Sequence, residues 1–297
     1  MTGADYTGEQ AARAIAVPTA SDDKYARGVL GVVTGSEQYP GAAVLGVEAA
    51  SRTGVGMIRY LGPERPAALV LARRPEVVTS DGRVQAWLIG SGTAPDRDPA
   101  ERERLLGLLG QALPTVLDAG ALDLVPEASG PVVLTPHFGE LLPVLRAAGV
   151  TATKDDVAAD PERWAVRAAR ETGVTVLLKG ATTIVADASG LRFRVRAGQP
   201  WLATAGSGDV LGGVLGALLA THGPAIAESP ALLGDLAAAA AWIHGDAGRI
   251  ASGGGPIQAL DVAEAVPAVI RRLLAAAERI HSGRRGAASG PSVPSTP

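Results

Sequence analysis

The chain has 297 residues, a length that suits one large α/β domain or two smaller ones. Hydrophobic residues make up 47% and charged residues 19%, so the chain can bury a sizeable core and global disorder is excluded. The net charge of −3 argues against a general binder of nucleic acid or of membrane surfaces, and the absence of cysteine excludes disulfides, thiolate metal sites and a cysteine nucleophile. The sequence shows no transmembrane segment and no signal peptide, so we expect a soluble cytoplasmic protein.

From about residue 24 the sequence alternates short apolar strands with helices. We expect strands at 29–33, 55–61, 76–79, 87–89, 115–117, 132–134 and 174–178, a hairpin of strands at 182–186 and 191–195, and helices at 42–52, 101–112, 139–148, 160–171, 209–220, 231–250 and 259–280. This alternation predicts an α/β fold, a three-layer sandwich in which helices cover both faces of a mostly parallel central sheet. In sheets of this kind, ligands bind beyond the carboxyl ends of the strands.

The two ends of the chain stand apart from this pattern. Residues 1–23 are expected to form an N-terminal segment, with a short helix at 8–15 followed by a connector that contains proline. Residues 24–280 are expected to form one domain, because no linker interrupts them. Residues 281–297 are of low complexity, and we expect them to be disordered.

The stretch Gly206-Ser207-Gly208-Asp209 is the most informative part of the chain. It is a flexible loop that runs directly into an apolar helical pattern, so Asp209 should lie near a helix N-terminus. Free backbone N–H groups and the helix dipole make such a site an anion hole, and glycines let a phosphate approach the backbone closely. Two roles remain open for Asp209: a helix cap, or a base that faces a substrate hydroxyl beside the bound phosphate.

Other polar motifs also follow strands. They are G-S-E-Q-Y-P-G at 35–41, G-S-G at 90–92, Asp118, T-P-H-F-G-E at 135–140 and K-G-A-T-T at 179–183. The His137 imidazole could contact a polar ligand or be structural, and Glu140 could cap the next helix or hold a metal-bound water. Lys179 suits a nucleotide phosphate but could also be a solvated lysine at a strand end. We expect His244 to be structural, with a place in a base pocket as the alternative.

Taken in order, these motifs resemble the ADP-dependent (S)-NAD(P)H-hydrate dehydratase family, which has the ribokinase-like fold. The resemblance rests on Y-P-G-A-A at 39–43, G-x-G at 90–92, T-P-H-x-G-E at 135–140, L-K-G-A-x-T at 178–183 and G-S-G-D-V-L-x-G at 206–213, and it spans about residues 24–276. The family dehydrates the S-epimer of hydrated NADH or NADPH (NADHX or NADPHX), while ADP becomes AMP and phosphate in the presence of Mg²⁺. Two positions depart from the family pattern: Gly120 stands where a second Asp is typical, and Ser91 stands where Pro is usual.

The resemblance implies a site shared by two ligands. The hydrated cofactor would contact Ala42, Gly92, His137 and Asp209. The adenine nucleotide would contact Lys179, Gly180, Ala181, Thr182, Thr183 and Gly208, with an anion hole formed by Gly206, Ser207 and Gly208. Asp209 would be the catalytic base that activates the C6 hydroxyl of the hydrate. The resemblance also implies Mg²⁺ as cofactor and ADP as co-substrate, with Glu140 as a candidate to hold the metal through water.

The same resemblance suggests the partners of the chain. We expect small-molecule substrates, no nucleic acid and no membrane, and a homo-oligomer that is a tetramer in the family. No epimerase domain is recognisable in the sequence, so we expect a separate epimerase in the same pathway. Two other functions are considered: an ATP-using kinase of the hydroxymethylpyrimidine or hydroxyethylthiazole type, and a non-catalytic nucleotide sensor. The T-P-H-x-G-E motif favours the dehydratase over the kinase, and Lys179, Gly208 and Asp209 together argue against the sensor.

Overall fold

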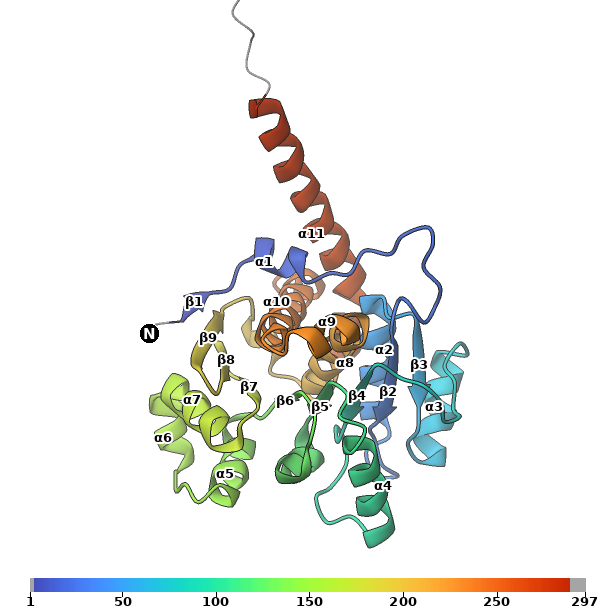
Figure 1. Cartoon of the computed structure of the whole chain (residues 1–297), viewed down its shortest axis with the longest axis vertical. Helices are drawn as coiled ribbons and strands as arrows, with labels where there is room; N and C mark the ends of the chain where they lie inside the picture. Colours follow the sequence, from blue (N-terminus) through green and yellow to red (C-terminus); the bar gives the residue numbers. More distant parts are fainter. Residues whose placement is uncertain (1–2, 289–297) are drawn as a thin grey trace, which may run out of the picture.

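A nine-stranded sheet runs through the molecule in the order β1-β9-β8-β7-β6-β5-β4-β2-β3 (Figure 1). The computed structural model describes residues 3–288. The strands are β1 (Ala4–Asp5), β2 (Val29–Val33), β3 (Met57–Tyr60), β4 (Ala86–Ile89), β5 (Thr115–Leu117), β6 (Val132–Leu134), β7 (Thr175–Leu178), β8 (Thr183–Asp187) and β9 (Gly190–Val195). Strand β8 runs antiparallel to β7 and β9, and the other neighbouring pairs are parallel. The predicted α/β fold with a mostly parallel sheet is confirmed.

Helices cover the sheet on both sides, above and below it in Figure 1. They are α1 (Gly8–Arg13), α2 (Gly41–Thr53), α3 (Glu64–Arg73), α4 (Pro99–Leu109), α5 (Phe138–Ala147), α6 (Lys154–Ala159), α7 (Pro161–Thr172), α8 (Ser207–Thr221), α9 (Gly223–Glu228), α10 (Leu232–Ser252) and α11 (Ala259–Ala288), with the 3₁₀ helices η1 (Ala119–Glu127) and η2 (Pro200–Leu202). Among the described helices, none combines the length and the apolar character needed to cross a membrane.

The central strands are mostly apolar because both of their faces are buried. In β2, Leu30 and Val32 pack in one core with α2, α8, α10 and α11, whereas Val29 and Val33 pack in a second core with α4, η1, α5 and α7. Gly31 makes room for a neighbour, since a Cβ at this position would lie 2.1 Å from the ring of Trp87 on β4. The three-layer sandwich therefore follows from the burial pattern of the strands.

Several elements differ from the sequence-based expectation. Residues 76–79 do not form a strand, and only an isolated bridge joins Val78 to Arg59. The N-terminal segment contains the expected short helix as α1, which packs on α10 and α11, and it also contributes β1, which was not expected and pairs with β9. Helices α3, α6 and α9 were not expected; α3 buries only Pro66 and Val70, so its apolar periodicity is weak. Helix α11 continues to Ala288, beyond residue 280, and the rest of the expected tail lies outside the described residues.

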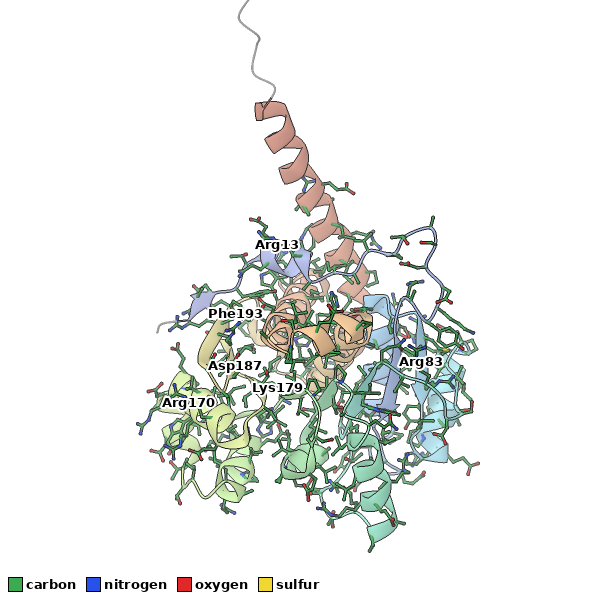
Figure 2. All side chains as sticks on the ribbon, viewed as in Figure 1. Arg13, Arg83, Arg170, Lys179, Asp187 and Phe193 are labelled. Atoms are coloured by element: carbon green, nitrogen blue, oxygen red, sulfur yellow. The ribbon has the colours of Figure 1, made fainter. Side chains whose placement is uncertain are left out.

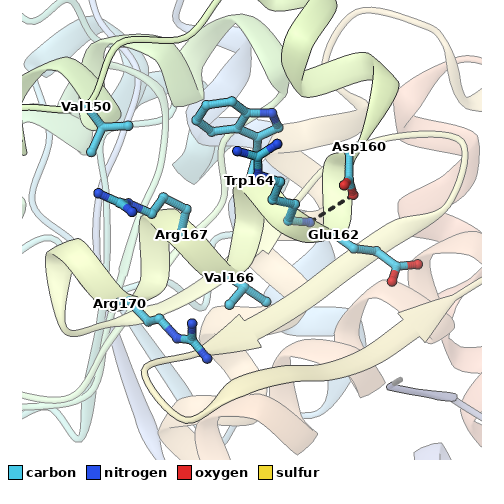
Figure 3. Close-up of a pocket in the computed structure, with 8 residues that line it drawn as sticks. Val150, Asp160, Glu162, Trp164, Val166, Arg167 and Arg170 are labelled. Atoms are coloured by element: carbon cyan, nitrogen blue, oxygen red, sulfur yellow. Dashed lines mark hydrogen bonds between the residues drawn. The ribbon is translucent and has the colours of Figure 1, made fainter. Parts of the chain in front are cut away.

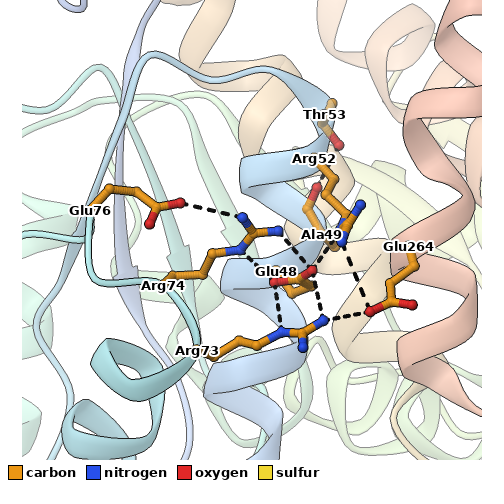
Figure 4. Close-up of polar contacts among 8 residues, drawn as sticks. All are labelled: Glu48, Ala49, Arg52, Thr53, Arg73, Arg74, Glu76 and Glu264. Atoms are coloured by element: carbon orange, nitrogen blue, oxygen red, sulfur yellow. Dashed lines mark hydrogen bonds and ion pairs between the residues drawn. The ribbon is translucent and has the colours of Figure 1, made fainter.

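A buried carboxylate joins three helices behind the ligand-binding edge of the sheet (Figure 4). Glu48 of α2 is fully buried and accepts hydrogen bonds from Arg52, from Arg73 of α3 and from Arg74, which binds both of its oxygens. Arg73 also contacts Glu264 of α11 at 2.5 Å. Burial alone would raise the pKa of Glu48, but the three guanidinium groups outweigh it and hold the pKa at about 2.

We predict that Glu48→Gln lowers the free energy of unfolding by about 3 kcal/mol, because it leaves three arginines without their shared anion. The depressed pKa means that this contribution is complete above the usual Glu value of 4.5 and fades as the pH falls toward 2. Urea denaturation of both proteins from pH 7 down to pH 2 measures the difference. Glu76→Gln is the matched control, since Glu76 is exposed and contacts only Arg74 at 3.4 Å. A Glu48→Gln variant as stable as the control at pH 7 contradicts the assignment.

Candidate active site

A cavity of about 900 Å³ opens at the carboxyl ends of the central strands. Figure 2 labels Lys179 in this central part of the molecule. The cavity is lined by Asp118, Ala119, His137, Glu140, Lys179, Gly180, Ala181, Thr183, Val195, Gly198, Gln199, Pro200, Leu202, Ala203, Thr204, Gly206, Ser207, Gly208, Asp209, Leu211, Ala241, His244 and Gly245. Five chain segments that are far apart in the sequence therefore meet around one space, and most of the expected site residues are among them.

Asp209 lies in the first turn of α8, as its sequence position predicts. The N-cap of this helix is Gly206, which adopts a left-handed conformation with φ of +86°. Within the described chain, no side chain caps α8 by a hydrogen bond. Asp209 is thus not engaged as a cap, and its half-buried carboxylate lines the cavity. Of the two roles left open by the sequence, this geometry favours the base.

The surroundings of Asp209 make its carboxyl group a weaker acid than usual. Burial raises the pKa of Asp209 to about 7, and the negative charges of Asp118 and Glu140 act in the same direction, against the ammonium of Lys179. A group with a pKa near neutrality can accept a proton at physiological pH and release it again. The position and the pKa of Asp209 both suit a general base.

Lys179 directly follows β7, and its ammonium group stands at the start of α8. The Nζ atom lies 3.0 Å from Oδ1 of Asp118 and 3.5 Å from Oε2 of Glu140. A Cβ placed on Gly208 would lie 3.5 Å from the same Nζ. Burial lowers the pKa of Lys179, but the two carboxylates outweigh this and raise it, so the side chain stays charged. An ammonium ion beside free helical N–H groups is a strong site for a phosphate.

His137 and Glu140 form a reciprocal cap at the start of α5. The backbone N–H of Glu140 donates to Nδ1 of His137 at 3.1 Å, and the backbone N–H of His137 donates to Glu140 at 2.8 Å. The His137 side chain is nevertheless 59% exposed, and both residues line the cavity. The structural and the ligand-facing interpretations of this pair are therefore compatible.

His244 has a larger part in the site than the sequence suggested. It lies in α10, is buried, and its Nε2 is 3.1 Å from Oγ of Ser207 at the first position of α8. Burial lowers the pKa of His244 to about 4, helped by the nearby Lys179 ammonium and opposed by the hydrogen bond to Ser207. The ring is neutral at physiological pH and fixes the Ser207 hydroxyl in the expected anion hole. The sequence did not indicate this contact, because His244 lies in an apolar helix 37 residues away from Ser207.

Three expected residues do not line this cavity: Ala42, Gly92 and Thr182. Ala42 and Gly92 meet each other, since a Cβ on Gly92 would lie 2.4 Å from that of Ala42. The same Cβ would lie 3.3 Å from Cα of Gly35, a residue that lines a second hollow of about 540 Å³. The residues expected to contact the hydrate therefore fall into two groups. His137 and Asp209 line the main cavity, whereas Ala42 and Gly92 lie toward the second hollow.

A third hollow, of about 620 Å³, lies on α7 and away from these residues (Figure 3). It is bordered by Arg163, Arg167 and Arg170, together with Asp160 and Glu162. The Asp160 carboxylate caps α7 by accepting the N–H of Arg163 at 3.1 Å. Glu162 pairs with Arg194 of β9, and none of the expected site residues lines this hollow.

Comparison with known proteins identifies the family. A family model described as NAD(P)H-hydrate dehydratase matches residues 30–266. The chain belongs to the NAD(P)H-hydrate dehydratase family. This finding confirms the resemblance that the motifs indicate.

Relatives of this NAD(P)H-hydrate dehydratase family member support the assignment. A bifunctional NAD(P)H-hydrate repair enzyme of Mycobacterium tuberculosis is 46% identical over 220 residues, covering 70% of this chain and 44% of that protein. The ADP-dependent (S)-NAD(P)H-hydrate dehydratase of Neisseria meningitidis is 33% identical over 75% of this chain and 77% of its own length. The ADP/ATP-dependent NAD(P)H-hydrate dehydratase of Bacillus subtilis, co-crystallised with ATP and Mg²⁺, matches with a TM-score of 0.80 at 25% identity, covering 92% of this chain and 99% of that one. The ribokinase-like fold is thereby confirmed.

We predict that Gly208→Ala weakens ADP binding by roughly tenfold, or about 1.4 kcal/mol, because its methyl group occupies space between Lys179 and the start of α8. Folding should not suffer, since alanine favours a helix over glycine. Isothermal titration calorimetry with ADP measures the affinity, and thermal unfolding checks the fold. Gly107→Ala in α4 is the control, because no other atom lies within 4 Å of its added Cβ. Unchanged ADP affinity in Gly208→Ala speaks against a phosphate at this place.

Proposed function

We propose that this chain catalyses the ADP-dependent dehydration of the S-epimer of NADHX or NADPHX to NADH or NADPH, with release of AMP and phosphate. The observation that carries the proposal is the carboxylate of Asp209, which does not cap α8 and lines a cavity of about 900 Å³. The Lys179 ammonium lies at the start of the same helix. A base next to an anion site is the arrangement that phosphoryl transfer to a hydroxyl requires. Names of family members, including the ADP-dependent enzyme of Neisseria meningitidis, support the reaction.

The reaction can be followed as a phosphoryl transfer and a subsequent elimination. Asp209 accepts the proton of the C6 hydroxyl while that oxygen attacks the terminal phosphorus of ADP, and AMP leaves with the bridging oxygen. The C6–O bond then breaks to release phosphate, because the ring nitrogen donates its electron pair and phosphate is a far better leaving group than hydroxide. Loss of a ring proton restores the dihydronicotinamide. Lys179 and the N–H groups at the start of α8 stabilise the phosphoryl charge during transfer.

The two ligands are assigned to different parts of the site. We place the terminal phosphate of ADP between Lys179 and Gly208, with Gly180, Ala181 and Thr183 along the nucleotide. We place the hydrate toward Ala42 and Gly92, with its C6 hydroxyl at Asp209. Between these two parts, His137 supplies an exposed imidazole at the rim.

Magnesium is proposed as the metal, because a Bacillus subtilis family member was co-crystallised with ATP and Mg²⁺. Within residues 3–288, no three His, Asp or Glu side chains form a cluster that could hold a metal ion by itself. Mg²⁺ typically binds one or two carboxylates, substrate phosphates and water, so a donor set centred on Glu140 fits it. Bound there, the ion would neutralise phosphate charge during transfer.

Partners are also proposed from the comparisons. The chain spans about half the length of the bifunctional repair enzymes that it matches. We propose that an epimerase that interconverts the two hydrate epimers acts together with this dehydratase, and that the chain assembles into a homo-tetramer, as the resemblance implies.

A small-molecule kinase is the main alternative. A hydroxyethylthiazole kinase from Pyrococcus horikoshii shares the fold, with a TM-score of 0.61 at 18% identity. The fold alone does not separate the two functions. The family match over residues 30–266 favours the dehydratase.

We predict that Asp209→Asn lowers kcat by about 10² to 10⁴-fold while ADP still binds, because only the proton acceptor is lost. The assay follows the recovery of reduced-nicotinamide absorbance from NADHX and NADPHX, with ADP or ATP as co-substrate. Phosphorylation of hydroxymethylpyrimidine or hydroxyethylthiazole with ATP is measured in parallel. Turnover of these alcohols by the wild-type protein, without dehydration of either hydrate, would replace the proposed function with the kinase.

We also predict an acid limb in the pH profile of kcat/KM with an apparent pKa of about 7. The base must be ionised to accept a proton, so the rate is full above this pKa and falls about tenfold per pH unit below it. Steady-state rates from pH 5 to pH 9, with ADP affinity measured over the same range, separate catalysis from binding. A kcat/KM that stays constant from pH 7 down to pH 5 would contradict a base with this raised pKa.

A further inference from the structure

Asp118 connects the segments that meet at the site. Its carboxylate is 3% exposed and lies at the end of β5. Oδ1 accepts hydrogen bonds from Thr135 Oγ1 at 2.7 Å and from Lys179 Nζ at 3.0 Å, and Oδ2 accepts one from Ser91 Oγ at 2.9 Å. Each of the three donors follows a different strand: β4, β6 or β7. A single buried group thus bridges the residues that follow three strands.

The bond to Asp118 also determines where the Lys179 ammonium lies. Lys179 has a long side chain with several rotamers of similar energy. The 3.0 Å contact with Asp118 and the 3.5 Å contact with Glu140 hold Nζ in a position that is also close to Gly208. An ammonium group has three donors, so Lys179 can keep Asp118 and still donate to a phosphate.

Ser91 supplies the donor for the second oxygen of Asp118. It lies between Gly90 and Gly92, which have φ of +107° and +69° and let the loop turn back over the sheet edge. Its carbonyl accepts the N–H of Gly35 at 2.7 Å, while its hydroxyl donates to Asp118. Ser91 therefore gives the buried carboxylate a neutral donor in addition to Thr135.

We propose that Asp118 is a positioning residue that holds the Lys179 ammonium at the start of α8, and that Ser91 supports it by satisfying the second carboxylate oxygen. The proposal rests on the proposed function, because it concerns the transfer of phosphate at that helix. It assigns Asp118 no contact with either substrate. Its effect on the reaction passes through Lys179, and this makes it testable by a double-mutant cycle.

The cycle compares Asp118→Asn, Lys179→Met and the double variant. Asparagine keeps the shape of the side chain and can still bond Ser91 and Thr135, so the fold is retained, as thermal unfolding will verify. We expect Asp118→Asn to lower kcat about 10- to 100-fold, the scale of a misplaced catalytic group, with the KM for the hydrate changed by less than about threefold. In the Lys179→Met background the same substitution should have almost no further effect. Losses that add in the double variant overturn the proposal.

A matched serine variant separates positioning from a purely structural role, because Asp118→Asn and Ser91→Ala act on the same buried carboxylate. Ser91→Ala should reduce kcat in the same direction by about three- to tenfold, the value of one hydrogen bond. Ser129→Ala removes a hydrogen bond from a serine hydroxyl to Leu109 O, at a residue that lines neither the cavity nor the second hollow, and should keep wild-type rates. Equal losses in Ser91→Ala and Ser129→Ala count against the proposal.

The same cycle, measured on ADP affinity by calorimetry, does not require turnover. We expect Asp118→Asn to weaken ADP binding in the wild-type background and to leave it unchanged in the Lys179→Met background. A wild-type protein that dehydrates neither hydrate would refute the proposed function, and the binding cycle would still decide the role of Asp118. Equal weakening of ADP binding in both backgrounds would refute the positioning role alone.

Discussion

Parallel pairing of β4, β5, β6 and β7 is the constraint on which the site depends. Parallel strands end at the same edge of the sheet, so the residues that follow them are collected there whatever their separation along the chain. Ser91, Asp118, Thr135 and Lys179 each follow one of these four strands, and all four side chains meet. Helix α8 then brings its N-terminus, with Asp209, to the same edge. The geometry of the proposed site is a direct consequence of the strand order.

Three acidic side chains at this edge of the sheet share one ammonium group. Asp118, Glu140 and Asp209 are all acidic, and Lys179 is the cation that acts on each of them. Two of the acids are committed: Asp118 is bonded by three donors, and Glu140 caps α5. Asp209 lacks a comparable set of donors and is buried near like charges, which leaves it as the group with a pKa near 7. The chemistry of the site follows from this unequal sharing of partners.

Much of this could be predicted from the sequence, because it depends on local signals. The Gly-Ser-Gly turn before an apolar helix placed Asp209 correctly, and apolar runs located the strands. What the sequence could not predict depends on contacts between distant segments. The Ser207–His244 pair spans 37 residues and the Asp118–Lys179 pair spans 61, and neither spacing leaves a pattern. The separation of Ala42 from the main cavity likewise depends on how α2 packs.

The reciprocal cap between His137 and Glu140 has a consequence for ligand selection. Since Nδ1 of His137 accepts a backbone N–H, the neutral ring must carry its hydrogen on Nε2. This tautomer offers a donor, and no acceptor, to whatever enters the cavity. A ligand oxygen that accepts a hydrogen bond, such as a carbonyl or phosphate oxygen, can therefore bind to the ring at this point. An amino group that only donates hydrogen bonds cannot.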